Sequence, residues 1–415
     1  MKICFFTDFY LPDPNGVAEN VALSAKSLEA RGHTVYIAAP RHPGFKDKDE
    51  HILRLPAVKV KKNPEFRLFV PVPAKDFGKL TGMKADIFHG HAGGTLTIFG
   101  WELARIKDIP YVFTYHTLLN RYTHYVPGNV LSPKVAEVAS RVYCNLTDHI
   151  IAPTSRVKKE LLSYGVEKPI SVIPGGIDLQ RFKNRSRGYL KTKLRLPKEA
   201  KILLYVGRLG KEKNVDFLLK AFKIIQNERK DTWLVIAGDG PEKQSLESLT
   251  KKLKVTDRCV FLSVVGRDKI PLVYAGADLF VFASTTETQG LVVPEAMASG
   301  LPIVAVRDEA FEGMIVNGET GFLVDENREE FAKQVLLVLE DQGLREQLSE
   351  SARKHVENHF SAENQAEALE QIYMEVIEEH RSKKRAIAYL KQKLLEVRNY
   401  VNLYERFARF KGIEK

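Results

Sequence analysis

Residues 2–39 read KICFFTDFYLPDPNGVAENVALSAKSLEARGHTVYIAA, and this stretch decides the fold class. Its apolar start, Lys2–Thr7, predicts a strand, which a loop rich in Pro, Asp, Asn and Gly follows. A helical pattern over Val17–Arg31 then stops at Gly32, the residue type expected just past a helix end. Val35–Ala39 is a second apolar strand. A strand, a helix and a strand in this order predict parallel pairing in an α/β sheet.

The same alternation continues on both sides of Pro174-Gly-Gly-Ile-Asp178, where two glycines after a proline suit a hinge. A length of 415 residues favours two domains, at about 100–200 residues each. We predict two doubly wound Rossmann-like domains facing a cleft, with ligands outside the carboxyl ends of the strands. The expected division is residues 1–176, residues 177–361 and a helical extension over residues 362–415. The further strands predicted are Ile52–Leu55, Ile87–His89, Tyr111–Thr114, His149–Ala152, Ile170–Ile173, Lys201–Val206, Trp233–Ala237, Val260–Leu262, Leu279–Ala283, Pro302–Val306 and Gly321–Val324, and the last helices are Arg328–Leu339, Gly343–Asn358 and Ala362–Glu379.

Two segments carry the positive charge of the chain. The net charge is +11, of which residues 381–415 contribute +8 and residues 54–75 contribute +5, so that the remainder is slightly acidic. Such segments indicate an anionic surface as partner. The last segment also has an apolar stripe with steps of three and four, which suits either a membrane surface or pairing with another copy of the chain. The stripe consists of Ile387, Leu390, Leu394, Val397, Val401, Tyr404 and Ala408.

Several classes of protein are not indicated by this sequence. No apolar run reaches about 18 residues, so we expect no membrane-spanning helix, and no nucleic-acid-binding motif is present. Three widely spaced cysteines suggest reduced thiols in a cytoplasmic protein. His89-Gly-His91 lacks a third metal ligand, and Asp47-Lys-Asp49 is interpreted as solvated surface. We therefore expect neither a metal nor another cofactor.

The strongest candidate site is Glu287-Thr-Gln-Gly-Leu-Val-Val-Pro-Glu295. A strand ends near Ala283, and Pro294 suits the first position of a helix. Backbone N–H groups at a helix start can hold a diphosphate, and the two carboxylates can accept hydrogen bonds from ribose and sugar hydroxyls. Taken alone, Glu295 could instead complement the helix dipole and Glu287 could be a solvated loop charge.

Three further groups lie where a strand is expected to end or a helix to begin. Arg208 and Lys213 flank a glycine-containing loop, as a diphosphate clamp requires, although a solvated basic turn is the alternative. His116 follows a strand in the first domain, where it could contact a transferred sugar or be structural. Gly16 precedes the first helix and permits close approach of a ligand to the backbone.

Together these motifs resemble the retaining glycosyltransferases of family 4, which have the GT-B fold. The resemblance covers about residues 1–380 and rests on the spacing of Glu287 and Glu295, the following Ala-Met-Ala-Ser-Gly-Leu-Pro-Ile-Val, and Gly207-Arg208 before Lys213-Asn214. It implies a nucleotide-sugar donor as substrate, retention of the anomeric configuration, and no metal.

The resemblance also implies a role for each candidate residue. Arg208 and Lys213 would neutralise the diphosphate, Glu295 would bind ribose, and the catalytic pair would be Glu287 on the sugar hydroxyls and His116 beside the sugar. The remaining donor-side residues would be Gly16, Val264 at the base, Gln289, and the N–H groups around Gly290 and Leu291.

A finer resemblance is to the diacylglycerol glucosyltransferases. Tyr115-His-Thr-Leu-Leu-Asn-Arg-Tyr-Thr-His-Tyr125 looks like their acceptor segment, so Tyr122 and His124 are expected on the acceptor side. This implies transfer of a hexose, glucose from UDP-glucose, to a membrane lipid such as 1,2-diacylglycerol. The enzyme would then be peripheral to the cytoplasmic membrane face and would use the basic segments 54–75 and 381–415. The alternatives are a soluble or phosphatidylinositol-type acceptor, or a non-catalytic protein that binds anionic surfaces.

Overall fold

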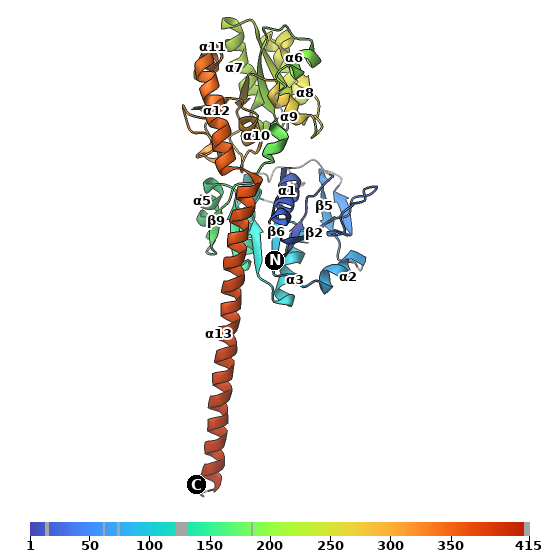
Figure 1. Cartoon of the computed structure of the whole chain (residues 1–415), viewed down its shortest axis with the longest axis vertical. Helices are drawn as coiled ribbons and strands as arrows, with labels where there is room; N and C mark the ends of the chain where they lie inside the picture. Colours follow the sequence, from blue (N-terminus) through green and yellow to red (C-terminus); the bar gives the residue numbers. More distant parts are fainter. Residues whose placement is uncertain (13–15, 61–62, 73–74, 122–131, 184–185, 411–415) are drawn as a thin grey trace.

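The computed structural model describes residues 1–12, 16–60, 63–72, 75–121, 132–183 and 186–410. Two α/β bodies lie one above the other, and a long helix runs from the upper body along the lower one and beyond it (Figure 1). Each body is built on one parallel sheet. Both sheets consist of short, nearly continuous apolar strands, which is the pattern expected where helices cover both faces.

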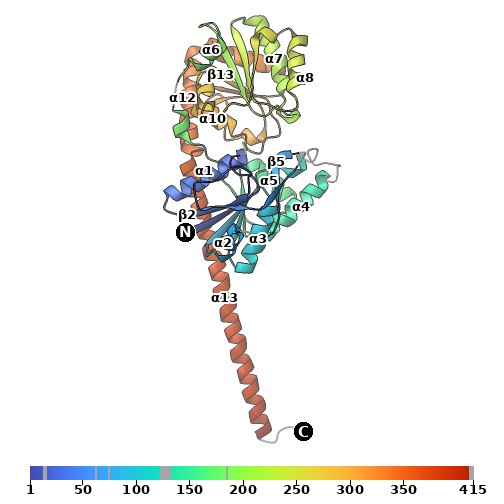
Figure 2. The same ribbon diagram turned by 90° about the vertical axis from the view of Figure 1, so that its right-hand side faces the viewer.

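The first body contains a seven-stranded parallel sheet in the order β3-β2-β1-β6-β7-β8-β9. Helix α1 packs on one face together with α13, and α3, α4 and α5 contribute to the apolar core on the other (Figure 2). The bounds are β1 Lys2–Thr7, α1 Gly16–Ala30, β2 Thr34–Pro40, β3 Ile52–Leu55, α2 Lys75–Gly82, β6 Ile87–His91, α3 Thr95–Lys107, β7 Tyr111–Thr114, a 3₁₀ turn Leu119–Arg121, α4 Pro133–Leu146, β8 His149–Ala152, α5 Ser155–Ser163 and β9 Ile170–Val172.

The second body contains a six-stranded parallel sheet in the order β12-β11-β10-β13-β14-β15. Its core joins all six strands to the helices around them. The bounds are α6 Tyr189–Leu194, β10 Lys201–Val206, α7 Val215–Glu228, β11 Thr232–Ala237, α8 Lys243–Leu253, β12 Cys259–Leu262, α9 Ile270–Ala275, β13 Leu279–Phe282, α10 Val292–Ala298, β14 Ile303–Val306, β15 Gly321–Val324, α11 Arg328–Glu340 and α12 Gln342–His359, with 3₁₀ turns at Leu179–Phe182, Lys211–Lys213, Thr256–Arg258 and Glu309–Phe311.

The chain passes between the two bodies twice at one place. Ile177 leaves the first body and forms a parallel bridge with Ser361, where the chain returns. The Ile177 N–H donates to the Phe360 carbonyl at 2.9 Å, and the Ala362 N–H donates to the Ile177 carbonyl at 3.1 Å. At Gly176 an added Cβ would lie 2.6 Å from the Ala362 Cα, so the crossing requires glycine there. The two connections are thus held together as one hinge.

Helix α13 spans Ala362–Phe410 without a break. Its first part packs into the core of the first body through residues that include Leu369 and Tyr373. From Arg381 to Lys393 every residue is exposed, and the helix continues away from both bodies (Figure 1). The helix predicted to end at Glu379 and the predicted tail helix are therefore one element. No helix of the described residues is both long and apolar enough to cross a bilayer.

A two-stranded hairpin, β4 Ala57–Val60 and β5 Asn63–Phe69, carries much of the basic segment 54–75. Two cations of the segment 54–75, Arg54 in β3 and Arg67 in β5, are not available to an anionic surface. Arg54 forms an ion pair with Asp47 at 2.8 Å, and Arg67 is buried. The interpretation of Asp47 as a solvated charge was therefore wrong, because the pair with Arg54 leaves its side chain only 10% exposed. The hairpin exposes Val58 and Leu68 together with the cation Lys59.

Candidate active site

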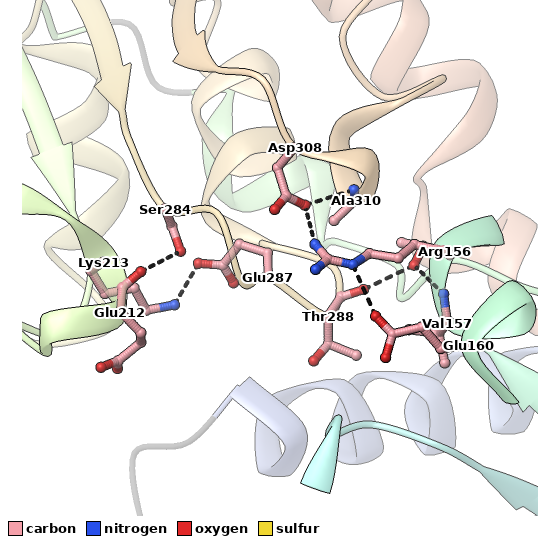
Figure 3. Close-up of polar contacts among 11 residues, drawn as sticks. Arg156, Val157, Glu160, Glu212, Lys213, Ser284, Glu287, Thr288, Asp308 and Ala310 are labelled. Carbon is pink, nitrogen blue, oxygen red and sulfur yellow. Dashed lines mark hydrogen bonds and ion pairs between the residues drawn. The ribbon is translucent and has the colours of Figure 1, made fainter. Parts of the chain in front are cut away.

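The loop that follows β13 holds Glu287 in a nearly enclosed position, with 7% of the residue exposed. The Lys213 Nζ lies 2.5 Å from the Glu287 Oε1, and the two form an ion pair (Figure 3). Lys213 ends the 3₁₀ turn after β10, so the ion pair joins the loops of two adjacent strands. The alternative of a solvated loop charge at Glu287 is excluded by this burial. The two loops thus bring the Glu287 carboxylate and the Lys213 ammonium together at one edge of the second sheet.

The start of α10 lies directly beyond this loop. Gly290 has φ +69°, a left-handed conformation that glycine adopts without a Cβ clash. Helix α10 begins at Val292, so Pro294 is its third residue and not its first as predicted. The backbone at Gly290 packs closely against Phe311, because an added Cβ there would lie 2.8 Å from the Phe311 ring. The backbone around Gly290 and Leu291 thus leads into the helix beside Glu287.

The loop after β10 is held against its neighbours. The Tyr205 hydroxyl donates to the Arg208 carbonyl at 3.0 Å, and the Ser284 hydroxyl donates to the Glu212 carbonyl at 3.3 Å. An added Cβ at Gly238 would lie 1.9 Å from the Gly207 carbonyl oxygen, so the β10 and β11 loops touch through their backbones. These contacts place Arg208 at the same sheet edge as Lys213, where both could face one diphosphate.

Glu295 lines a cavity of about 400 Å³ between the two bodies. The Tyr274 hydroxyl donates to its Oε2 at 2.9 Å. Burial raises the pKa of the Glu295 carboxyl to about 7. The cavity is lined by α1 of the first body and by Arg181, Arg267 and neighbouring groups of the second. A half-buried carboxylate beside a cavity that cations also line suits a bound ribose.

This pKa predicts how nucleotide binding depends on pH. Ribose hydroxyls donate to a carboxylate, so binding requires the ionised form of Glu295. We expect UDP affinity to fall by up to about tenfold per pH unit below the pKa and to level off above it. Calorimetric titration with UDP on both sides of neutral pH measures this. Glu295→Gln should bind UDP more weakly and retain only the pH dependence of the nucleotide phosphate. An identical pH profile in both proteins would contradict the role of Glu295.

His116 follows β7 at the carboxyl edge of the first sheet. It is half-buried, and burial lowers its pKa to about 4. The next strand over, β8, leads to Thr154, whose hydroxyl donates to the Thr288 carbonyl in the Glu287 loop at 3.1 Å. The edge of the first sheet that carries His116 therefore faces the edge of the second sheet that carries Glu287.

Two further contacts fasten the Glu287 loop and its surroundings to the first body. The Gln289 side chain accepts from the Gly175 N–H and donates to the Gly175 carbonyl, both at 3.0 Å. Arg156 of α5 forms a buried ion pair with Asp308 at 2.5 Å, and Asp308 also accepts from the Ala310 N–H (Figure 3). Both the oxygen and the nitrogen of the Gln289 amide are thus hydrogen-bonded to Gly175 at the hinge. We expect Gln289 to position the loop rather than to contact the donor.

The remaining predicted residues lie as follows. Gly16 begins α1, whose next turns line the cavity with Glu19 and Asn20. Val264 lies in the exposed loop after β12, and the same loop reaches the cavity through Arg267. Tyr122 and His124 lie outside the described residues.

Only one group of side chains within the described ranges has the spacing of a metal site. It consists of Glu29, Asp49 and His51, on the surface of the first body.

Sequence reasoning did not identify several residues of this region. Arg267 forms an ion pair with Glu19 of the first body at 2.7 Å, across the cavity. Tyr274 and Arg181 approach Glu295 from elements far from it in sequence. None of the three belongs to a local motif. Arg267 follows β12, Tyr274 lies in α9, and Arg181 lies just after the hinge. These positions in the fold were the only signal that could have indicated them.

Residues 14–181 match the family model described as Glycosyltransferase Family 4, and residues 187–355 match the one described as Glycosyl transferases group 1. An alpha-monoglucosyldiacylglycerol synthase of Acholeplasma laidlawii is 30% identical over 397 residues, which cover 92% of this chain and 99% of that protein. The chain belongs to glycosyltransferase family 4. A protein of the same name from Streptococcus pneumoniae is 32% identical over 312 residues, or 74% of this chain and 71% of that one.

Solved structures share the architecture of this chain. Sucrose-phosphate synthase from Thermosynechococcus elongatus superposes with a TM-score of 0.72 at 21% identity, covering 91% of this chain and 99% of that chain. The Anabaena protein HepE, solved with UDP and glucose, gives 0.71 at 20% identity, covering 90% of this chain and all of that one. The predicted GT-B fold, two Rossmann-like domains with a C-terminal helical extension, is therefore confirmed.

Proposed function

We propose that this glycosyltransferase is a retaining, metal-independent enzyme that moves glucose from UDP-glucose to a hydroxyl of 1,2-diacylglycerol. The observation that carries the proposal is the grouping of Glu287, Lys213 and Glu295 at one sheet edge, opposite His116. The names of the two relatives, synthases of alpha-monoglucosyldiacylglycerol, support glucose and the lipid acceptor. The HepE complex with UDP and glucose supports the donor.

Each of these side chains has a separate role in the proposed reaction. Lys213 and Arg208 balance the charge that develops on the diphosphate as the bond from the sugar C1 to the phosphate oxygen breaks. Glu287 binds sugar hydroxyls and is released from Lys213 when the diphosphate takes up that cation. The acceptor oxygen bonds to C1 from the face that the diphosphate leaves, and its proton passes to a phosphate oxygen. Retention of the anomeric configuration follows.

A lipid acceptor requires that the first body meet a membrane. Helix α4 has an exposed stripe of aliphatic side chains, each between 41% and 53% exposed: Val135, Val138, Val142 and Leu146. Lys134 and Arg141 lie on the same exposed surface. The Tyr115 hydroxyl lies 2.8 Å from the Ser140 hydroxyl, which ties α4 to the residue next to His116. Aliphatic side chains among cations suit insertion between anionic headgroups. The basic end of α13 provides a second contact.

Vesicle flotation tests the membrane contact. We expect the full chain to float with phosphatidylglycerol vesicles, to float less with phosphatidylcholine vesicles, and to detach at high salt. Val135→Glu with Val142→Glu should weaken flotation several-fold, because carboxylates are then forced toward the headgroups. Leu337→Glu, at an exposed apolar position of the second body, is the matched control. Absence of flotation by the wild type, or equal flotation by all three proteins, would contradict the membrane contact.

A different acceptor is the second candidate, because a D-inositol 3-phosphate glycosyltransferase of Rhodococcus jostii is also 30% identical, over 66% of this chain. Offering inositol phosphate and diacylglycerol in parallel separates the two. Deleting residues 381–415 distinguishes two roles for the end of α13, membrane binding and pairing with another copy of the chain. Loss of flotation with unchanged mass in solution indicates membrane binding, whereas a halved mass indicates pairing of two copies.

A further inference from the structure

Three histidines form a connected group between α13 and the active-site edge of the first sheet. His89 and His91 are alternate residues of β6, so both side chains lie on one face, with ring centroids 4.1 Å apart. His91 Nδ1 lies 3.1 Å from His116 Nε2. His89 is held at both nitrogens, by the Tyr373 hydroxyl at 2.6 Å and the Thr114 hydroxyl at 2.7 Å. His89 and His91 are buried.

Burial keeps the three rings neutral, since it lowers the pKa of each. A neutral imidazole carries one N–H, so the contact between His91 and His116 holds a single proton. Either His91 Nδ1 donates to His116 Nε2, or the reverse. The second arrangement would place the N–H of His91 on its Nε2. That atom is buried and has no hydrogen-bond partner among the described residues.

An unpaired buried N–H is rarer and more costly than an unpaired acceptor nitrogen. The first arrangement is therefore favoured, with the proton on His91 Nδ1. His116 must then accept at Nε2 and carry its own proton on Nδ1. The Nδ1 of His116 has no hydrogen bond to any described residue and is not among the buried unpaired atoms. Nδ1 is therefore the nitrogen from which His116 can donate to a ligand at the edge that faces Glu287.

The surroundings keep the His91 ring in this orientation. The Phe5 ring meets it edge-on, with centroids 4.8 Å apart, and the centroid of the His89 ring lies 4.1 Å from that of His91. The His91 and His116 rings are stacked at 5.4 Å, with 29° between their planes. A rotated His91 ring would lose the hydrogen bond to His116 without gaining another in the described surroundings.

We propose that His91 is a positioning residue that holds His116 as the Nδ1–H tautomer, so that His116 presents an N–H donor to a hydroxyl of the transferred sugar. His116 then orients the sugar and takes no proton from the acceptor. This role rests on the proposed function, in which the acceptor proton passes to the donor phosphate. The tautomer itself does not depend on that function.

Long-range ¹H–¹⁵N NMR of the histidine-labelled protein tests the tautomers without any substrate. We expect both His91 and His116 to be protonated at Nδ1, whereas a free neutral histidine prefers Nε2–H. His91→Phe should return His116 to the Nε2–H form. An Nε2–H signal for His116 in the wild-type protein overturns the proposal.

Two conservative variants test positioning against packing. An asparagine amide can occupy the place of Nδ1, whereas a glutamine amide reaches toward Nε2. His91→Asn should therefore keep transfer within a few-fold of the wild type, and His91→Gln should lower kcat by about tenfold or more. His149→Gln, in the adjacent strand β8, is the control expected to retain activity. Equal losses in both His91 variants would indicate packing alone. Predicted tautomers in a protein inactive on every donor would contradict the proposed function but not the hydrogen bond.

Discussion

Glu287→Ala should lower kcat for sugar transfer by about 10²–10³ without unfolding the protein. The carboxylate is nearly enclosed and lies 2.5 Å from the Lys213 ammonium, at the place proposed for the donor sugar. Removing it deletes hydrogen bonds to the sugar and leaves a cation that no longer has its partner. Because the ion pair is already broken when donor binds, the loss should appear mainly in kcat. Initial rates at saturating UDP-glucose measure it.

Glu287→Gln separates the effect of the carboxylate charge from the effect of the side chain's size and hydrogen-bonding groups. The amide can still contact sugar hydroxyls but does not pair with Lys213, so we expect an intermediate rate. Glu340→Ala, at the exposed end of α11, should behave as the wild type. Circular dichroism and melting temperature establish that each variant is folded. A near-normal rate for folded Glu287→Ala would show that Glu287 has no role in transfer.

Asp308→Ala should destabilise the protein by about 3–5 kcal/mol, because it leaves Arg156 buried with a weakened partner set. Arg156 is 6% exposed and Asp308 is 3% exposed at the side chain. The remaining acid near Arg156, Glu160, is more exposed and lies 3.4 Å away. The Ala310 N–H also loses its acceptor. Urea unfolding followed by tryptophan fluorescence and circular dichroism measures the change.

The adjacent residue provides a matched control for this ion pair. Arg307 pairs with Asp325 on the surface, with side chains 55% and 75% exposed. Asp325→Ala should cost no more than about 1 kcal/mol, because solvent screens such pairs. The double variant Arg156→Leu, Asp308→Leu should recover part of the loss, since it leaves no unpaired buried charge. Equal costs for Asp308→Ala and Asp325→Ala would contradict the importance of the buried pair.

Much of the fold could be predicted from periodicity. Strands such as Lys2–Thr7, Tyr111–Thr114 and Gly321–Val324 have the predicted bounds, because buried parallel strands are short apolar runs between turn residues. The continuous α13 could not be predicted. Its residues change from core-facing to exposed near residue 380, and this change resembles a boundary in sequence although the backbone continues.

The candidate site was partly predictable. Local motifs identified Glu287, Glu295 and Lys213, since each follows a strand or begins a helix. Their partners could not be derived locally. The pair of Lys213 and Glu287 spans 74 positions, and the contact of Gln289 with Gly175 spans 114. The first contact depends on which strands are neighbours in the second sheet, and the second depends on how the two domains meet. Gln289 was therefore assigned to the donor, whereas its side chain binds the hinge.

Mass spectrometry of reaction products tests the central claim most directly. The protein is given UDP-glucose, UDP-galactose or GDP-mannose, each with diacylglycerol in phosphatidylglycerol vesicles and with a chelator present, and Glu287→Ala serves as background. The account predicts a diacylglycerol that gains one hexose from UDP-glucose, with little product from the other two donors. Absence of hexosylated diacylglycerol with all three donors, or the same yield from Glu287→Ala as from the wild type, would contradict it.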